Sequence, residues 1–356
     1  MERRVSLDAL RGIAALIVLI SHCVGTLPEL HAAALSTVVL RPLLMGGSWV
    51  DVFFVLSGYV LYLTFDRKDQ FLYLPYLAKR IARIYPPLVA AVLISLIFYL
   101  LTAPEPIPGL SEWFNTLSWN IYPTPEVVAG HLMLSDARSA QSLDNVIWSL
   151  VHEVRISILF PVLALCTRRW LLATLICSAL LSSSAHIIAA RMSAELPINP
   201  AATLQYVFCF AAGAALARRE AALGRWMQSR QGQIGGIVIA LIGVALLSFS
   251  PARLGGMLTA CGAVAIVAAC AVHPLVKRSL AVAPLIWVGR VSYSLYLIHL
   301  PILLLLVHNL SPAIGAPLAV ALTVPVSLGC AEIFHRWIEQ PSMVLGRWGS
   351  AKLRSA

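Results

Sequence analysis

Three ionisable side chains occur at helical spacing along the first apolar stretch of the chain. Asp8 precedes residues 10–27, and Arg11 and His22 lie within them. Eleven residues separate Arg11 from His22, which is about three turns of an α-helix, so both side chains project from one face roughly 16 Å apart. Asp8 lies one turn before Arg11 and can pair with it. His22 is either a general base or a histidine hydrogen-bonded between helices, beside a snorkelling Arg11.

A second ionisable cluster lies in the apolar residues 148–166. His152 and Arg155 are spaced i, i+3, and Ser149 and Glu153 are spaced i, i+4, so each pair shares a helix face. Such a cluster cannot face lipid, because ionisable groups at hydrocarbon depth need a cavity or a partner. It is either a buried ion-pair network that orders the helices or part of a site in which a carboxylate orients a catalytic imidazole.

Several further polar positions are weaker candidates. Asp51 is either a site residue or a negative charge favoured at a helix N-terminus. Ser57 and Gly58 permit close helix approach or the passage of a ligand chain. His299 lies in the middle of an apolar span and is more typical of a packed polar group. A further group, at the inner end of the last span, consists of Glu332, His335 and Glu339.

These residues must be positioned by membrane helices. The 356 residues are 59% hydrophobic and only 12% charged, and their mean hydropathy is +0.83. Soluble domains are about 45–50% apolar and about 25% charged, so a soluble protein of this length is excluded. With roughly 20 residues per crossing, we predict an all-α, polytopic membrane protein with about ten transmembrane helices. The predicted spans are 10–27, 48–65, 86–102, 148–166, 170–190, 203–217, 234–250, 255–272, 291–309 and 316–334.

The net charge of +10 follows this membrane topology. With the N-terminus cytoplasmic, most of the 26 lysines and arginines fall in inside segments. The exceptions are Arg41, Arg138, Arg191 and Arg253 in outside segments and Arg11 and Arg155 within spans. The positive-inside rule therefore predicts cytoplasmic N- and C-termini. The charge indicates a lipid bilayer as the environment and no nucleic-acid partner.

The remaining segments suggest one domain. We expect residues 1–340 to form a single transmembrane domain and residues 341–356 a short basic cytoplasmic tail. Residues 103–147 read as an outside loop and residues 66–85 as a basic inside segment, after which Pro86 suits the first turn of the third span. The seven cysteines lie mostly in apolar spans without CxxC or metal-type spacing, so we expect no disulfide framework and no metal site.

Motifs in order along nearly the whole chain resemble those of the acyltransferase-3 family of integral membrane acyltransferases. The matching segments are residues 7–15, the R-x10-H pair Arg11 and His22, residues 50–59, the R-x-x-R pair Arg80 and Arg83 before residues 84–86, residues 148–150 with Glu153, residues 289–299 and residues 338–341. One departure is that Val154 and Arg155 follow Glu153 where relatives often continue with a Glu-Gln-Phe-Tyr-like string.

The resemblance implies transfer of an acyl group, usually acetyl, from cytoplasmic acyl-CoA to a hydroxyl of a cell-surface or exported carbohydrate. The acceptor is a carbohydrate or lipid-linked glycan at the outer face of the bacterial inner membrane. Acyl-CoA is then a donor substrate, and no cofactor is bound permanently. Arg80 and Arg83 are expected to bind the CoA phosphates, and Arg11 either holds the CoA arm or braces its helix through Asp8.

His22 is the expected catalytic base, with Glu153 first and Asp51 second as the carboxylate that orients its ring. A covalent acyl-His22 intermediate is the alternative. Residues expected to support catalysis or contact the acceptor are Ser57, Gly58, Trp148, His152, Arg155 and His299.

Two other functions use the same residues. A transporter or flippase also places Arg, His and Glu inside a helix bundle, although paired half-repeats are not evident in this sequence. A scaffold without catalytic activity in a polysaccharide assembly complex is a third interpretation. The residues do not specify the acceptor, the acyl length or whether the protein forms a homo-oligomer.

Overall fold

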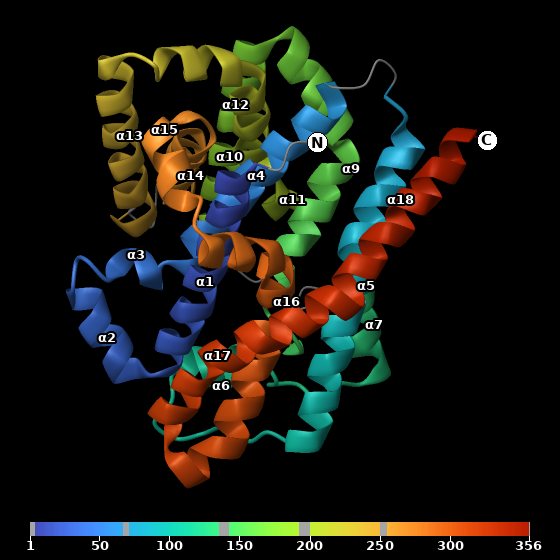
Figure 1. Ribbon diagram of the computed structural model, residues 1–356. Coiled ribbons are helices and arrows are strands. Elements are labelled where there is room, and N and C mark those ends of the chain that lie inside the picture. The colour runs from blue at the N-terminus through green and yellow to red at the C-terminus, as the bar shows by residue number, and fades with distance from the viewer. Residues whose placement is uncertain (1–3, 67–70, 135–141, 192–199, 250–254, 356) are drawn as a thin grey trace.

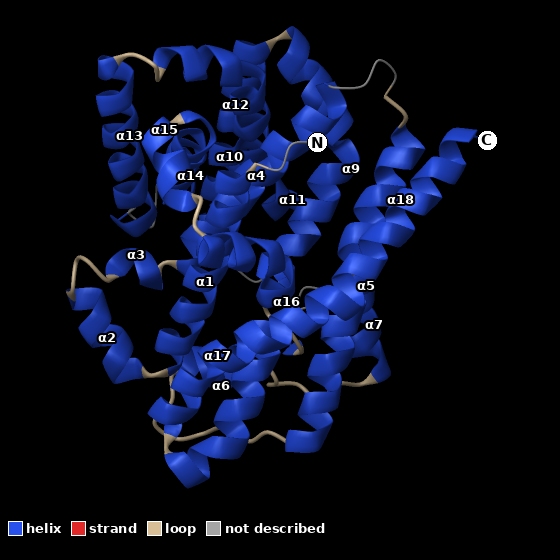
Figure 2. Ribbon diagram, in the orientation of Figure 1, coloured by secondary structure: helices blue, strands red, loops and turns tan. Residues whose placement is uncertain are grey.

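The computed structural model describes residues 4–66, 71–134, 142–191, 200–249 and 255–355. Every regular element within these ranges is helical (Figures 1 and 2). The helices are α1 Val5–Thr26, α2 Pro28–Ser36, α3 Arg41–Leu44, α4 Gly46–Asp66, α5 Tyr73–Thr102, α6 Glu112–Leu117, α7 Pro125–Met133, α9 Ile147–Arg169, α10 Leu171–Arg191, α11 Pro200–Thr203, η1 Leu204–Tyr206, α12 Val207–Trp226, α13 Arg230–Phe249, α14 Gly255–Val272, α15 Pro274–Leu280, α16 Ala283–Ile314, α17 Ala316–Phe334, the π-helix η2 His335–Glu339, and α18 Gln340–Ser355.

Nine stretches of helix in the described ranges are long and apolar enough to cross a membrane. α14 and α15 meet at an 86° bend, and they give a tenth crossing if the bent pair is counted as one span. The bend follows from Pro274, which cannot continue the preceding helix, while the side chain of His273 caps α15 by accepting from the Val276 amide at 3.4 Å. The prediction of an all-α, polytopic membrane protein is confirmed; the cytoplasmic location of the termini stays a prediction.

The beginning of the third span differs from the sequence prediction. α5 begins at Tyr73, so Pro86 lies inside a helix of 30 residues rather than in its first turn. At 1.5 Å per residue such a helix is about 45 Å long, which exceeds the roughly 30 Å of bilayer hydrocarbon. The polar residues before Pro86 therefore extend the span on the same helix. Arg80 and Arg83 are consequently held by a helix, not by a loop.

The predicted C-terminal tail is also helical. Residues 340–355 form α18, which packs along α5 (Figure 1). Gly346 allows this approach, since a Cβ at this position would lie 2.8 Å from the Cβ of Ala82. α18 thus covers one side of the helix that carries Arg80 and Arg83.

Two glycine crossings set the register of the central helices. A Cβ on Gly12 would lie 2.6 Å from the Gly289 nitrogen, so α1 and α16 are in backbone contact at this point. Ten residues further along each helix, His22 meets His299, which shows that α1 and α16 run parallel. A second crossing joins α4 to α12, where a Cβ on Gly58 would lie 2.2 Å from the Phe210 carbonyl oxygen.

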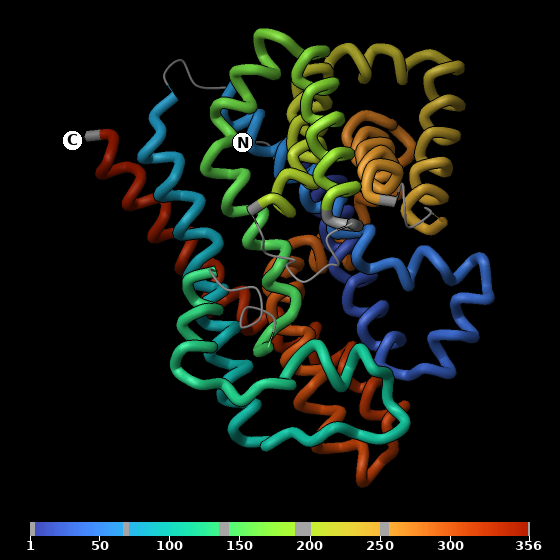
Figure 3. The backbone as a smooth tube through the Cα atoms, turned by 180° about the vertical axis from the view of Figure 1, so that it is seen from behind, coloured from blue at the N-terminus to red at the C-terminus, as the bar shows by residue number. Residues whose placement is uncertain are grey.

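The predicted outside loop contains α6 and α7 and crosses the same end of the bundle as α2 (Figures 1 and 3). Trp119 anchors it by donating from Nε1 to the Ser95 hydroxyl of α5 at 3.0 Å. The parts of this loop that hold Asp136 and Arg138, and the basic pair Arg67 and Lys68, lie outside the described residues, as do the backbone of Arg253 and the side chain of Arg191. The end of the bundle crossed by α2 and α6 is called the loop end below, and the opposite end, where α1 and α5 begin, the basic end.

Candidate active site

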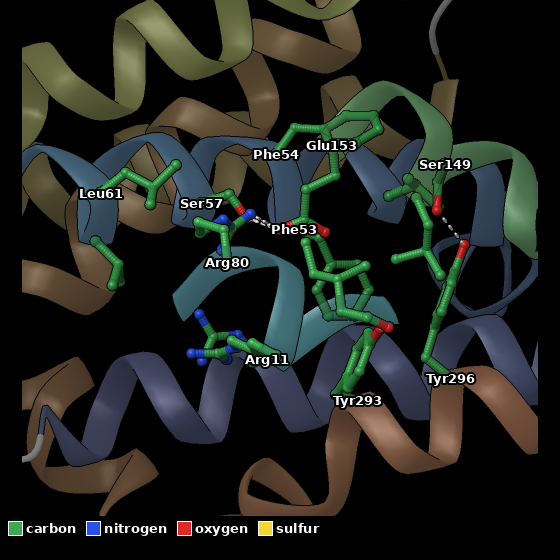
Figure 4. A pocket seen from close by; sticks show the side chains of 15 residues that line it. Arg11, Phe53, Phe54, Ser57, Leu61, Arg80, Ser149, Glu153, Tyr293 and Tyr296 are labelled. Carbon is green, nitrogen blue, oxygen red and sulfur yellow. Dashed lines mark hydrogen bonds and ion pairs between the residues drawn. The ribbon is translucent and has the colours of Figure 1, made fainter. Parts of the chain in front are cut away.

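A narrow cavity of about 70 Å³ lies between α1, α4, α5, α9 and α16 (Figure 4). It brings Arg11 of the first ionisable cluster beside Ser149 and Glu153 of the second. Its walls are formed by Arg11, Val50, Phe53, Phe54, Ser57, Val60, Leu61, Arg80, Arg83, Ile84, Ser149, Leu150, Glu153, Tyr293 and Tyr296. Arg11 and Arg80 lie in its half nearer the basic end, and Ser149 and Tyr296 lie toward the loop end (Figure 4).

An ion pair joins α5 to α9 in this cavity. Arg80 donates to Glu153 Oε1 at 2.8 Å and to the Ser157 hydroxyl at 2.7 Å. Ser57 donates to the same Glu153 oxygen at 3.0 Å. The side chains of Arg80 and Glu153 are only 13% and 19% exposed, so the pair is largely removed from water and depends on these hydrogen bonds to offset desolvation.

Two further guanidinium groups face the same space. Arg11 lies 3.7 Å from its predicted partner Asp8, too far for a hydrogen bond. Arg83 makes no ion pair or hydrogen bond within the described part of the chain. The cavity lining thus carries three arginines and one carboxylate, which is already paired with Arg80. This excess of positive charge favours an anionic group with several acceptor oxygens.

His22 lies in the last turns of α1, near the loop end, and contacts a second histidine. Its Nδ1 is 2.9 Å from Nε2 of His299, and the two rings are stacked with centroids 5.1 Å apart. Trp113 of α6 stacks on the His22 ring as well, at a centroid distance of 4.9 Å. Three elements therefore fix the plane of this imidazole.

The hydrogen bonds assign the tautomers of both neutral rings. The carbonyl oxygen of Leu295 can only accept, so His299 Nδ1, which lies 3.0 Å away, carries a proton. Nε2 of a neutral His299 is then an acceptor, and His22 Nδ1 must be the donor to it. The lone pair of His22 is therefore on Nε2, which has no hydrogen-bond partner among the described residues. An imidazole in this state is ready to accept a proton.

Tyr296 connects the cavity to the histidine pair. Its hydroxyl group is 2.8 Å from the Ser149 hydroxyl, and its ring lies 5.6 Å from Phe53 and 6.1 Å from His299 between centroids. Tyr296 lines the cavity and His22 does not. The Tyr296 side chain thus lies between the cavity wall and the histidine pair.

The expectation that a carboxylate orients His22 is wrong. Glu153 is held by Arg80 and Ser57, and the Asp51 carboxylate accepts from Thr259 at 2.7 Å. Neither contacts the His22 ring in the described structure, because each is already held by a partner on another helix. His299, predicted only as a supporting residue, occupies the orienting position.

Other predicted residues separate onto two faces of α9. Ser149 and Glu153 face the cavity, whereas His152 contacts Thr203 at 2.9 Å and Arg155 donates to the same hydroxyl at 3.3 Å. The sequence predicts the four residues as one cluster, although the spacing of the two pairs is consistent with this division. His152 and Arg155 therefore hold α11 against α9 rather than line this cavity.

Gly58 lies outside the cavity wall. Its neighbour Ser57 faces the cavity, but Gly58 contacts the backbone of α12. Of the two interpretations of Gly58, passage of a ligand chain is wrong and close helix approach is confirmed, since a Cβ would overlap the Phe210 carbonyl oxygen. Trp148 faces a different cavity, which it shares with Asp51.

Sequence reasoning missed four residues of this region. Ser157 lies one turn after Glu153, and Tyr296 lies one turn before His299, so helical spacing contained a signal for both. Tyr293 closes the cavity and donates to the Ile84 carbonyl at 3.0 Å. Trp113 comes from a loop, and no spacing rule connects it to His22. No group of three or more His, Cys, Asp or Glu side chains in the described ranges is arranged to hold a metal ion.

Comparison with known protein families finds a match over the region that carries this site. A family model described as an acyltransferase domain matches residues 4–336, which include every helix that lines the cavity. Neither curated proteins nor solved structures give a match. Since the matched region covers nearly the whole chain, this membrane protein is an acyltransferase and belongs to the acyltransferase-3 family.

Proposed function

We propose that the protein transfers an acyl group, usually acetyl, from acyl-CoA to a hydroxyl group of a carbohydrate, with His22 as the general base. The observation that carries this proposal is the hydrogen-bond chain from the Leu295 carbonyl through His299 to His22, which leaves Nε2 of His22 as an acceptor. A stacked ring of Trp113 holds the imidazole in this orientation.

The donor is proposed to bind from the basic end. CoA is a polyanion, and Arg11 and Arg83 retain hydrogen-bonding capacity that no described partner fills. Arg80 forms an ion pair with Glu153, so its side chain is held in one position while it adds positive charge to the site. Arg11 and His22 lie eleven residues apart on α1, roughly 16 Å along the helix, a distance that an extended pantetheine arm covers. The nucleotide then stays at one end of the bundle while the thioester reaches His22.

The chemical step is acyl transfer coupled to two proton transfers, one to His22 and one from it. His22 Nε2 accepts the proton of the carbohydrate hydroxyl as the hydroxyl oxygen attacks the thioester carbonyl carbon. The resulting imidazolium donates from Nδ1 to His299 Nε2, the bond already present in the structure. Collapse of the tetrahedral intermediate breaks the carbon–sulfur bond, and the proton on His22 passes to the departing thiolate.

The sidedness follows from the charge distribution. The basic end carries the segments that the positive-inside rule places in the cytoplasm, where acyl-CoA exists. The histidine pair lies toward the loop end, so the acceptor is proposed to enter from outside the bacterial inner membrane. Asymmetric access of this kind lets the acyl group cross without the nucleotide.

A labelling experiment tests the proposal. Membranes containing the protein are incubated with radiolabelled acetyl-CoA and a glycan extract, and label in the glycan is counted. We expect labelled glycan with the native chain and background label with His22→Ala, at equal amounts of inserted protein. His31→Ala is a matched control, since His31 lies on α2 and makes no side-chain hydrogen bond or ring contact with the described site residues. Undiminished transfer by His22→Ala rules out His22 as the base.

A further inference from the structure

A second cavity, of about 240 Å³, lies at the loop end of the bundle. It is formed where α4 and α14 begin and where α10 and α13 end, so it opens at the end opposite to the one where Arg80 and Arg83 lie. Its lining includes Met45, Gly47, Ser48, Asp51, Trp148 and Tyr206. The helices that carry Asp51 and Trp148 also line the first cavity.

Polar groups converge on this cavity with unused hydrogen-bonding capacity. Asp51 is only 7% exposed, and the one contact of its carboxylate within the described residues is the hydrogen bond from Thr259 to Oδ2. Over the same ranges, the Trp148 ring N–H, the Tyr206 hydroxyl and the Ser48 hydroxyl make no hydrogen bond. A ligand with several hydroxyl groups can satisfy all of these donors and acceptors.

Two aromatic rings form an apolar wall beside these polar groups. The rings of Trp148 and Tyr206 lie 5.9 Å apart between centroids. Tyr206 also contacts Phe54 at 4.7 Å and His152 at 4.9 Å, and His152 is itself hydrogen-bonded to Thr203. The wall is therefore held by its neighbours before any ligand arrives, which lowers the entropy cost of binding.

The second cavity shares α4 and α9 with the first cavity and lies beside α1, the helix that carries His22. Gly46, between the lining residues Met45 and Gly47, packs against Ser21, which precedes His22 in α1. On α9, Trp148 faces the second cavity while the next residue, Ser149, faces the first. A molecule bound here thus lies beside the elements that present His22.

We propose that the second cavity binds a neutral sugar ring of the acyl acceptor. Sugar rings combine apolar C–H faces, which pack on aromatic rings, with hydroxyl groups, which match the free donors and acceptors of Asp51, Trp148 and Tyr206. The Asp51 carboxylate disfavours an anionic sugar. The volume is below the about 300–1,000 Å³ of drug-sized ligand pockets, so the cavity fits one ring of a glycan. The inference that the bound sugar is the acyl acceptor rests on the proposed function, whereas the inference that a sugar binds in this cavity does not.

Sugar binding is measured on the full chain in amphipol, a polymer that carries no sugar group. Saturation-transfer NMR is recorded with the methyl glycosides of glucose, galactose, mannose, rhamnose and N-acetylglucosamine, and with methyl glucuronide as the anionic comparison. We expect ring-proton saturation for at least one neutral glycoside and none for the glucuronide. Absence of saturation for every neutral glycoside, or stronger saturation for the glucuronide, overturns the proposal.

Variants locate the bound sugar. Trp148→Ala removes a hydrogen-bond donor and a packing ring, and Asp51→Asn replaces a charged acceptor by a neutral one, so each is expected to weaken binding about fivefold or more. Trp170→Ala is the matched control, because Trp170 is 62% exposed and lies at the other end of α9. Variants are compared only at equal elution volume and helix content, and Trp148→Phe, which keeps a ring, should bind more strongly than Trp148→Ala. Unchanged binding by Asp51→Asn and Trp148→Ala overturns the assignment to this cavity.

One further variant separates this proposal from the proposed function. His22→Ala should bind the glycoside as the native chain does, since His22 does not line the second cavity. If the native chain binds the sugar but transfers no acyl group, the proposed function fails and the sugar site stands. If it transfers acyl groups while the cavity variants leave the KM of the acceptor unchanged, the assignment of this cavity to the acceptor fails.

Discussion

Replacing His299 tests how the tautomer of the His22 imidazole is determined. In the structure, His299 Nε2 accepts from His22 Nδ1 at 2.9 Å, and this contact defines which nitrogen of His22 holds the lone pair. His299→Phe keeps a ring of similar shape but removes the acceptor. Nδ1–H of His22 is then left unpaired, and the other tautomer, with its proton on Nε2, is no longer disfavoured. That tautomer cannot act as the base at Nε2.

The expected size of the effect follows from the charge that develops on His22. In the transition state the imidazole becomes an imidazolium, and a hydrogen bond to a charged group contributes about 1.5–3 kcal/mol. At about 1.36 kcal/mol for each factor of ten, His299→Phe should lower kcat about 10- to 150-fold. The KM for acyl-CoA should stay unchanged, because His299 does not line the cavity that holds the arginines.

The assay is transfer of radiolabel from acetyl-CoA to a glycan by purified, reconstituted protein at several donor concentrations. His299→Gln restores a carbonyl acceptor and should recover part of the lost rate. His308→Phe is the matched control: His308 lies on the same helix and makes the same type of bond, from Nδ1 to the Leu304 carbonyl at 2.9 Å, but it stacks on Phe114 instead of His22. A native kcat in His299→Phe, or equal loss in the Phe and Gln variants, refutes the tautomer argument.

Three further predictions concern stability in detergent. Glu153→Leu leaves the Arg80 charge in the cavity without its partner and should destabilise the fold by about 3 kcal/mol, whereas adding Arg80→Met should recover most of this loss; thermal unfolding of the single and double variants measures it, and additive losses would contradict it. Gly58→Ala places a Cβ 2.2 Å from a carbonyl oxygen of α12 and should cost about 1–3 kcal/mol, while Gly329→Ala, which meets nothing within 4 Å, should cost little; equal unfolding temperatures would be inconsistent with the close crossing. Burial lowers the pKa of His131, which lies outside the spans, from 6.5 to about 4. Between these pH values the unfolded chain therefore binds more protons than the folded chain. The stability that neutral His131 contributes to the fold is complete above pH 6.5 and is lost as the pH falls. His131→Phe should therefore gain about 2 kcal/mol relative to the native chain between pH 7 and pH 5, and a pH-independent difference in unfolding free energy would argue against the buried neutral ring.

Local spacing accounts for the features that the sequence predicted well. Long apolar runs indicated the membrane helices because a bilayer requires about 20 apolar residues per crossing. The i, i+3 and i, i+4 spacings of α9 identified the two pairs that share a face, since both rules depend only on helix geometry, but they did not show that His152 and Arg155 face away from the cavity. The start of α5 was missed because polar residues before Pro86 resemble a loop when no helix partner is known.

Contacts between distant segments were beyond local spacing. His22 and His299 are 277 residues apart, and their contact requires the parallel crossing of α1 and α16 at Gly12 and Gly289. Nothing in either segment alone specifies that register. The same holds for Glu153, whose partner Arg80 comes from a helix whose start was misplaced. A nearby carboxylate was therefore expected at His22, whereas the packing brings an imidazole there.

The central claim is that an acyl group passes from a donor at the basic end to an acceptor at the loop end, with His22 as the base. The most direct measurement uses sealed proteoliposomes in which the protein has one known orientation, with glycan inside, radiolabelled acetyl-CoA outside and the basic end facing outward. We predict label on the enclosed glycan with the native chain and none with His22→Ala. Label only on glycan added outside, or equal labelling of the enclosed glycan by His22→Ala, would contradict the account.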